Sequence, residues 1–454
     1  MDELRQLLDQ ASDHAARFRA SLATRPVAPV ADGAAARAAF SGPLPLRPTE
    51  PGKVIDELAA LAEPGLMGSA GPRFFGFVIG GALPAATAAE VLTAGWDQVG
   101  FNATLSPAAV AAEEQAGAWA KELLGIPASA SVGLVTGAQA ANTVGLAAAR
   151  HHVLAEAGWD LPARGLFGAP RVRVVASVER HATVDRSLRL LGFGAEEIEP
   201  VAADANGALD LADLRRVLGE PGVPLIVCLQ SGNVNTGACD DLRAACDLVH
   251  AHGGWAHVDG AFGLWAGASP ATRYLVDGVE LADSWGCDAH KWLNVPYDSA
   301  LALCSRPLVH ATAMSYTAAY LTGSGAEPNG ADFTAESSRR ARGFAVWAAL
   351  KELGRDGVAD LVERCCALAR RFADGLRAAG FEVVNDIVLN QVLVGFGDAD
   401  VDAMVTAVQR EGTCWLGATT WRGRRLMRIS VSNYSTTESD VDASVAAIIR
   451  LAKV

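Results

Sequence analysis

The sequence is short of positive charge. It contains 38 Lys and Arg residues against 51 Asp and Glu residues, which gives a formal net charge of −13 at pH 7. Nucleic acids and anionic membranes are bound through basic surfaces. The charge balance therefore argues against a nucleic-acid partner and against a membrane partner.

Metal-site spacing, a signal peptide and long apolar runs are missing as well. The eight cysteines include no C-x-x-C pair, so we predict no metal site and expect reduced, mostly buried thiols. The first turn carries Asp2, Glu3 and Arg5 rather than a basic stub before an apolar run. Gly, Pro or charged residues also interrupt the apolar stretches well short of a membrane span. These absences predict a soluble, cytoplasmic protein.

Apolar residues, by contrast, are plentiful. They make up 50% of the 454 residues, which is enough for a large core, and the length predicts two or three packed subdomains. Residues 2–22 have the pattern of an amphipathic helix, with Leu4, Leu8 and Phe18 on one stripe, and a proline-rich connector follows. The pattern leaves open whether this helix packs on its own chain or across a dimer.

Short apolar runs alternate with helical segments from about residue 85 to about residue 310. The runs are rich in Val, Leu, Ala and Cys and cover 131–136, 171–177, 225–231, 255–261, 283–289 and 300–305. Strands that alternate with helices predict a mainly parallel sheet covered on both faces, with functional groups at the carboxyl ends of its strands.

The remaining segments complete a three-part prediction. Beyond the large domain, helical segments are followed by the strand-like segments 382–396 and 426–433, which together predict a smaller α+β domain. We therefore expect an N-terminal helical segment over 1–84, a large α/β domain over 85–344 and a small C-terminal domain over 345–454.

Two ionisable residues follow strands of the predicted large domain. Lys291 comes after the run DSWGCDAH, and its neighbours Trp292 and Leu293 would partly desolvate the amine, which favours imine chemistry. Asp259 ends the strand WAHVD, with the small residues Gly260 and Ala261 beside it. Each has a structural alternative: a surface lysine at the start of a loop, and an aspartate that caps a loop.

Two further sites suit a phosphorylated aromatic ligand. In SVGLVTGAQAAN a strand leads through a turn into a helix, so the backbone N–H groups of Gly137, Ala138 and Gln139 would form an anion site. His181, in SVERHATVDRS, follows another strand and would supply a flat imidazole. A generic turn and a hydrogen-bonded loop histidine are the structural alternatives. The turn lacks the G-x-G-x-x-G spacing of dinucleotide-binding folds.

Together, the four sites match what pyridoxal 5'-phosphate (PLP) needs. This cofactor requires a lysine for its aldimine, an acid at its pyridine nitrogen, a phosphate cradle and a flat group over the ring. Lys291, Asp259, the 137–139 turn and His181 supply these in turn.

The wording of the motifs closely resembles the group II PLP-dependent amino-acid decarboxylases, the family of the aromatic amino-acid, glutamate and cysteine-sulfinate decarboxylases. The resemblance covers most of the chain, through PRFFGFVIGGALPA, FNATLSPAAVAAEEQAGAWAKELLG, TGAQAAN, HATVDRS, SGNVNTGACDDL, HVDGAFG, DAHKWLN and SSRRARGFAVWAALKELG. It implies the aspartate-aminotransferase-like fold of PLP enzymes (fold type I), and a homodimer with its N-terminal helices swapped.

The resemblance also implies a role for each matching residue. Lys291 would carry the cofactor as an aldimine, Asp259 would pair with the pyridinium, and His181 would stack on the ring opposite Ala261. Ser284 and His290 would assist the phosphate cradle. Phe75, Phe77 and Phe101 fall where the family forms its substrate pocket, which favours an apolar or aromatic amino acid, whereas an acidic substrate would need a cation such as Arg73.

The expected reaction is the decarboxylation of an L-amino acid. The alternatives within PLP chemistry are retro-aldol cleavage, transamination, and decarboxylation with oxidative deamination to an aldehyde, and a non-catalytic binding protein is an alternative of another class. Many relatives carry a tyrosine on a mobile loop that protonates Cα. The matching stretch here, LTGSGAEPNGADFTAESS after Tyr320, has Phe333 as its one aromatic residue. His181 or a water molecule would then have to supply that proton.

Overall fold

The computed structural model describes residues 2–315 and 329–452, which divide into two compact units. The first unit comprises Met1–Gly81, Arg371–Val384 and Leu393–Val454, and the second comprises Ala82–Arg370 and Asn385–Val392. The three-part division expected from the sequence stays a prediction.

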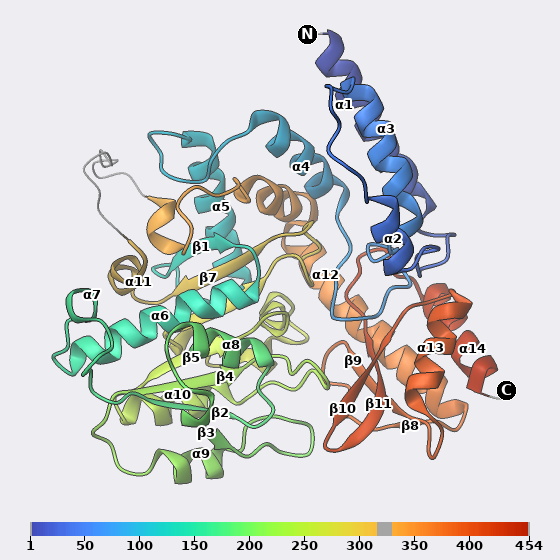
Figure 1. Ribbon diagram of the computed structural model, residues 1–454. Helices are drawn as coiled ribbons and strands as arrows, with labels where there is room; N and C mark the ends of the chain where they lie inside the picture. Colours follow the sequence, from blue (N-terminus) through green and yellow to red (C-terminus); the bar gives the residue numbers. More distant parts are fainter. Residues whose placement is uncertain (1, 316–328, 453–454) are drawn as a thin grey trace. The chain divides into compact units, whose positions relative to one another are not determined.

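The second unit is built on a seven-stranded sheet with the order β1-β7-β6-β5-β4-β2-β3 (Figure 1). β7 runs antiparallel to β1 and β6, and the other pairings are parallel. Each of the six predicted runs forms a strand here, and β3 is an addition. The strands are β1 (Ser131–Val135), β2 (Arg173–Ser177), β3 (Ile198–Val201), β4 (Leu225–Gln230), β5 (Trp255–Asp259), β6 (Ser284–Asp288) and β7 (Ala300–Cys304).

Both faces of this sheet are covered. Every residue of β4, β5, β6 and β7 is buried, and alternate residues of a strand point to opposite faces. Helix α6 (Ala138–Glu156) packs against β5, β6 and β7. It comes very close, because a Cβ at Gly145 would lie 2.8 Å from the His257 ring. This close packing fixes the start of α6 beside the carboxyl ends of β5 and β6.

The remaining helices of the second unit connect and flank these strands. They are α4 (Pro84–Trp96), α5 (Pro107–Leu124), α7 (Leu161–Arg164), α8 (Ala182–Leu190), η2 (Ala195–Glu197), α9 (Leu211–Leu218), α10 (Leu242–Ala251), η3 (Gly263–Ala268), η4 (Arg273–Val276), η5 (Val279–Leu281), α11 (Pro307–Met314) and η6 (Gly330–Phe333). The long helix α12 (Gly343–Ala378) begins in this unit and is interrupted at Gly354, whose φ is 61°.

The first unit contains a four-stranded sheet with the order β10-β11-β9-β8. β8 pairs antiparallel with β9, and β10 pairs antiparallel with β11. Together with the larger sheet, it confirms the predicted fold class. Its elements are β8 (Glu382–Val383), β9 (Gln391–Gly395), α13 (Val401–Glu411), β10 (Gly417–Trp421), β11 (Arg424–Ser430) and α14 (Glu438–Ala452).

The predicted N-terminal helix is confirmed as α1 (Asp2–Ser21), and it packs on its own chain. It lies beside α3 (Pro51–Ala62) (Figure 1), where His14 Nε2 lies 2.8 Å from an oxygen of Asp56. No residue of α1, of α3 or of the short α2 (Gly33–Ala39) is buried, and η1 (Glu63–Gly65) follows α3. The apolar stripe of α1 is thus only partly covered, because Leu4 and Leu8 remain exposed.

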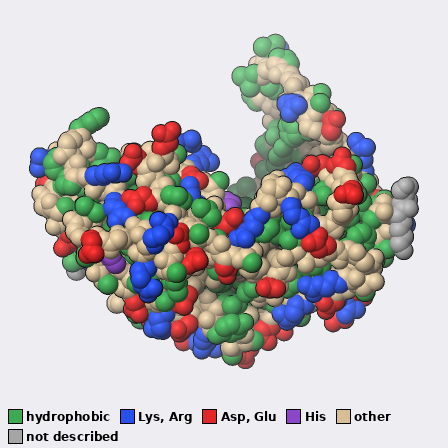
Figure 2. All heavy atoms as spheres, turned by 90° about the horizontal axis from the view of Figure 1, so that it is seen from below, with side chains coloured by type: hydrophobic (Ala, Val, Ile, Leu, Met, Phe, Trp, Pro, Cys, Tyr) green, Lys and Arg blue, Asp and Glu red, His purple; other side chains and the backbone are tan. Residues whose placement is uncertain are grey.

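The distribution of charged side chains and the state of the cysteines agree with the amino-acid composition. Figure 2 shows Lys and Arg side chains interspersed with Asp and Glu over one face of the molecule. All eight cysteines are free and all but Cys239 are buried, which confirms the expected thiols. No helix among the described residues is long and apolar enough to cross a membrane. The cytoplasmic location stays a prediction.

Candidate active site

Lys291 lies directly after β6, next to the carboxylate that ends this strand. Its Nζ is 2.9 Å from Oδ2 of Asp288, whose side chain is only 2% exposed. The backbone of Asp288 is also fixed, since the Trp265 indole donates a hydrogen bond to its carbonyl at 2.9 Å. Asp288 was not among the residues singled out from the sequence, although its place at the end of a strand was a usable signal.

Asp259 ends β5, the strand next to β6. Its Oδ1 accepts a hydrogen bond from the Ala261 backbone N–H at 3.3 Å, and the Ala261 carbonyl accepts one from the Asp288 N–H at 2.8 Å. Burial raises the pKa of the Asp259 carboxyl above its ordinary value, while the positive charges of His181 and Lys291 act in the opposite direction. The structure therefore brings Asp259, Ala261 and Lys291 to one edge of the sheet.

The predicted anion site also reaches this edge. Gly137 is the N-cap of α6, and the N–H of Ala138 donates to Oδ1 of Asp288 at 2.5 Å. Gln139 donates through Nε2 to Ser187 Oγ at 2.8 Å, whereas its buried Oε1 has no partner among the described residues. A negatively charged oxygen thus already occupies the N-terminus of α6, as expected for an anion-binding helix start.

His181 caps helix α8, which follows β2. Its Nδ1 accepts a hydrogen bond from the Thr183 backbone N–H at 3.2 Å and lies 2.8 Å from Thr183 Oγ1. When the ring is neutral, its proton is therefore on Nε2. A turn after β4 supports this loop, because Asn233 Nδ2 donates to the Glu179 carbonyl at 3.1 Å. The sequence reasoning did not assign Asn233.

His290 and Ser284 have different surroundings. His290 accepts the Ser299 backbone N–H at Nδ1, and its Nε2 is 3.4 Å from Asp288 Oδ1. Burial lowers the pKa of the His290 imidazole, and the charge of Asp288 opposes that shift. Tyr297, which the sequence reasoning also missed, stacks on the His290 ring with 4.2 Å between centroids.

Ser284 is not brought to the cradle. It begins β6, whereas the other groups lie where β6 ends, and strands rise by about 3.3 Å per residue. Its Oγ accepts a hydrogen bond from the Trp255 indole and lies 2.8 Å from His257 Nδ1, within the buried core.

The three predicted pocket phenylalanines are divided between the units. Phe101 belongs to the second unit, and Phe75 and Phe77 to the first. Phe75 is buried edge-on against Phe372 in the core of its unit. Phe77 is 66% exposed and has a φ of 56°, and the next residue, Val78, has a φ of 57°. Such values in a β-branched residue mark local backbone strain, which functional loops often contain.

Arg73, the candidate cation for an acidic substrate, is engaged in its own unit. It donates through Nε to the Thr413 carbonyl at 2.7 Å and through Nη1 to the Ala23 carbonyl at 2.8 Å. Asp440 lies 3.4 Å away. These contacts indicate a structural role for the Arg73 guanidinium.

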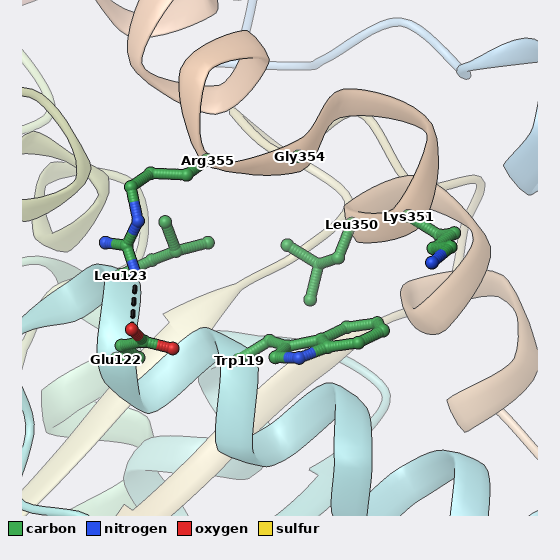
Figure 3. Close-up of a pocket in the computed structure, with 7 residues that line it drawn as sticks. All are labelled: Trp119, Glu122, Leu123, Leu350, Lys351, Gly354 and Arg355. Atoms are coloured by element: carbon green, nitrogen blue, oxygen red, sulfur yellow. Dashed lines mark hydrogen bonds and ion pairs between the residues drawn. The ribbon is translucent and has the colours of Figure 1, made fainter.

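A separate cavity of about 340 Å³ lies between α5 and α12. Figure 3 shows Trp119 as its floor, Leu350 above the indole and the Arg355–Glu122 ion pair at one side. None of its lining residues belongs to the groups around Lys291, so it is not the predicted site.

The stretch 321–338, which contains no tyrosine, is only partly described. Residues 321–328 lie outside the described residues, and the ring of Phe333 packs against that of His310 with 5.1 Å between centroids.

The groups at this edge fit PLP. A lysine amine, a buried carboxylate and a helix start that binds negative oxygen all come from the second unit and meet through Asp288 and Ala261. Ala261, beside Asp259, has a small side chain that is only partly buried. These are the groups that the cofactor's aldehyde, pyridine nitrogen and phosphate require.

Comparison with known proteins leads to the same chemistry. The profile of the family described as "Pyridoxal-dependent decarboxylase conserved domain" matches residues 37–396. Tryptophan decarboxylase 1 of Oryza sativa subsp. japonica is 28% identical over 95% of this chain and 90% of its own length. Phenylacetaldehyde synthase of Arabidopsis thaliana is 26% identical over 86% and 83%. The crystal structure of Oryza sativa TDC with PLP and tryptamine superposes with a TM-score of 0.91 at 26% identity, covering 100% of this chain and 98% of that one.

Proposed function

The chain belongs to the pyridoxal-dependent decarboxylase family and is a PLP-dependent amino-acid decarboxylase, and we propose that Lys291 carries its cofactor and that its substrate has an apolar or aromatic side chain. One observation supports the site above all. Asp259 ends β5 and Lys291 follows β6, and because these two strands are adjacent and parallel, both residues reach the same edge of the sheet.

Each remaining group has one proposed task in holding the cofactor. The N–H groups of Gly137, Ala138 and Gln139 bind its phosphate, because a helix start stabilises negative charge. His290 supports this cradle from the end of β6. Ala261 and His181 would hold the flat ring between them.

Asp259 and His181 act on charge and on protons. The bound cofactor supplies an electron sink for the pair released when the substrate carboxylate leaves as CO2. Asp259 keeps a positive charge on the ring nitrogen by ion pairing, and that charge in turn favours its ionised form. The Nδ1 of His181 is engaged by Thr183, so Nε2 is the atom from which a proton can return to Cα.

The substrate class rests on Phe77, Phe101 and Arg73. Phe75 lies in the core of the first unit, whereas Phe77 exposes its ring on a strained loop. We therefore retain Phe77 and Phe101, each by itself, as proposed contacts of the substrate side chain. An acidic substrate would need a cation in the pocket, and Arg73 already binds two backbone carbonyls. An apolar or aromatic side chain therefore fits best.

A second outcome is favoured by one sequence feature, the absence of tyrosine from residues 321–338. Without that proton donor, molecular oxygen can take up the electrons. One amino acid, one O2 and one water would then give aldehyde, CO2, ammonia and H2O2. A relative at 26% identity is named phenylacetaldehyde synthase, which makes this outcome worth measuring.

We also propose a homodimer. Within the second unit, α4, α5 and α12 line a groove of about 630 Å³ with Leu92, Trp96 and Trp347. These three side chains are between 38% and 50% exposed. Monomers rarely leave such contiguous apolar surface open, and a second copy of the chain would bury it.

The deciding experiment is a screen of the amino acids in air with all products quantified. Amine equal to CO2 supports decarboxylation, and aldehyde with ammonia and peroxide supports the oxidative outcome. Consumption of the substrate without release of CO2 would exclude both decarboxylation and the oxidative outcome.

A further inference from the structure

Asp288 is a buried carboxylate to which the proposed reaction gives no task. It is the last residue of β6, and its two oxygens have different partners. Oδ1 accepts the N–H of Ala138 at 2.5 Å, and Oδ2 pairs with Nζ of Lys291 at 2.9 Å. The carboxylate therefore connects the start of α6 to the lysine.

Both partners of Asp288 are groups that PLP needs. The Ala138 N–H belongs to the phosphate cradle, and one N–H in this geometry serves one acceptor at full strength. The Lys291 amine must attack an aldehyde carbon, and an ammonium held against a carboxylate has no free lone pair for that attack. Asp288 thus makes within the protein the two contacts that the cofactor would make.

Asp288 lies among groups of both charge signs, and its own carboxylate disfavours a second anion. Lys291 and the His290 ring, whose Nε2 lies 3.4 Å from Oδ1, face it from the segment after β6, and Asp259 adds a further carboxylate from β5. The start of α6 contributes its N–H groups. A phosphate dianion that enters this buried space meets a like charge, and like charges repel strongly where water is excluded.

We propose that Asp288 is an internal ligand that competes with the cofactor, and that its charge sets how tightly PLP is held. This inference rests on the proposed function, because it takes Lys291 and the start of α6 as cofactor contacts. The carboxylate contacts both groups. To bind the cofactor, it would have to give up the Ala138 N–H to the phosphate and release Lys291. Asp288 is therefore a positioning residue that weakens cofactor binding.

The test is a titration of the cofactor-free enzyme with PLP, followed by absorbance and by quenching of tryptophan fluorescence. Asp288→Asn keeps the shape of the side chain and removes its charge, so its Kd for PLP should fall about tenfold or more. For pyridoxal, which lacks the phosphate, the same substitution should lower the Kd by a smaller factor. Asp277→Asn, which removes an exposed carboxylate of the same unit, is the matched control and should leave the Kd unchanged.

The outcomes separate this inference from the proposed function. If the wild-type enzyme binds PLP and Asp288→Asn binds it equally or more weakly, Asp288 is not a competitor. If the wild-type enzyme binds no PLP, the proposed function itself fails. Asp288→Ser, with a smaller neutral side chain, provides the same comparison should the asparagine variant fail to fold.

Discussion

Two opposing effects act on the carboxyl of Asp259. Burial disfavours its charged form, and the charges of His181 and Lys291 favour it. A ring nitrogen that carries positive charge adds to the second effect, so cofactor and carboxylate stabilise each other's charged forms.

Asp259→Asn should retain PLP and lose catalysis. The amide cannot hold the ring nitrogen protonated, so kcat should fall by about 10²–10³-fold or more, while Lys291 and the start of α6 still bind the cofactor. The measurement is steady-state CO2 release together with the PLP content of the purified variant. Asp277→Asn serves as the control. Activity like that of the wild type in Asp259→Asn would exclude this residue from the mechanism.

Lys291→Ala should lose both turnover and covalent attachment of the cofactor. Only a primary amine can form and exchange that link. After borohydride reduction, mass spectrometry should detect the added cofactor on the wild-type chain and not on the variant. Lys351→Ala, which alters an exposed lysine of α12, should behave as the wild type. A reducible link in the Lys291 variant would place the cofactor on another residue.

His257 predicts a pH dependence of stability. It is buried between Ser284 and Asn142, and burial lowers its pKa from 6.5 to about 3. Between pH 6.5 and pH 3, His257 is protonated in the unfolded chain and neutral in the folded chain. The free energy of unfolding is therefore unaffected by His257 above pH 6.5. It falls as the pH decreases toward 3, by up to about 1.4 kcal/mol per pH unit.

Denaturant unfolding of the cofactor-free protein between pH 7 and pH 4.5 measures this slope. His257→Gln cannot titrate, so the free energy of unfolding of this variant should fall less steeply with decreasing pH than that of the wild type, by at most the contribution of one proton. Equal slopes for His257→Gln and the wild type would show that His257 does not contribute.

Several site residues could be found from the sequence because each stands at the end of an apolar run. Lys291, Asp259 and His181 follow such runs, and parallel strands bring their carboxyl ends to one edge. Asp288 satisfied the same criterion and was missed, because its partner Ala138 lies 150 positions earlier in the sequence. Ser284 lies at the beginning of β6 instead, and the sequence pattern does not distinguish the two ends of that strand.

At the scale of elements, the strands that the sequence failed to indicate are those with weak apolar patterns. β3 contains Glu199 and Pro200, and β10 contains Thr419 and Thr420. Both lie at the edge of their sheets, where one side needs no neighbouring strand and the sequence constraint is relaxed. The central strands β4 to β7 are buried throughout, and their continuous apolar runs were recognisable.

A buried ion pair joins three elements of the second unit. Arg339, which precedes α12, donates through both terminal nitrogens to Glu113 of α5 at 2.8 Å, and both side chains are almost fully buried. Glu113 also accepts the Leu134 N–H of β1 at 3.2 Å. The pair thereby fixes α5 and the segment before α12 against the edge of the sheet.

Arg339→Met should destabilise the fold by about 3–5 kcal/mol, because it leaves the Glu113 carboxylate buried without its partner. The double variant Glu113→Leu with Arg339→Met should recover much of that loss, since both charges are then absent. Denaturant midpoints of the three proteins measure the effect. A single variant as stable as the wild type would contradict the assignment of this pair as a structural link.

At the scale of the whole molecule, apolar surface remains exposed among residues 2–315 and 329–452. In the first unit, α1 and α3 expose Leu4, Leu8, Val54 and Leu58, each at 45% or more. In the second unit, the groove lined by Leu92, Trp96 and Trp347 stays open. The sequence could predict these stripes from their periodicity, but periodicity does not identify the surface that covers them.

The last prediction follows from that apolar surface. The holoenzyme should scatter light as a dimer of twice 47.1 kDa, because burial of about 25 cal/mol per Å² of apolar surface favours association. Trp347→Glu places a charge in the groove and should shift the protein toward monomers with reduced activity. Leu308→Glu alters another exposed apolar residue, which is 84% exposed on α11 and outside the groove, and should leave the dimer intact. A fully active wild-type protein at the mass of one chain would refute the dimer, and a Trp347→Glu variant that stays dimeric would place the interface elsewhere.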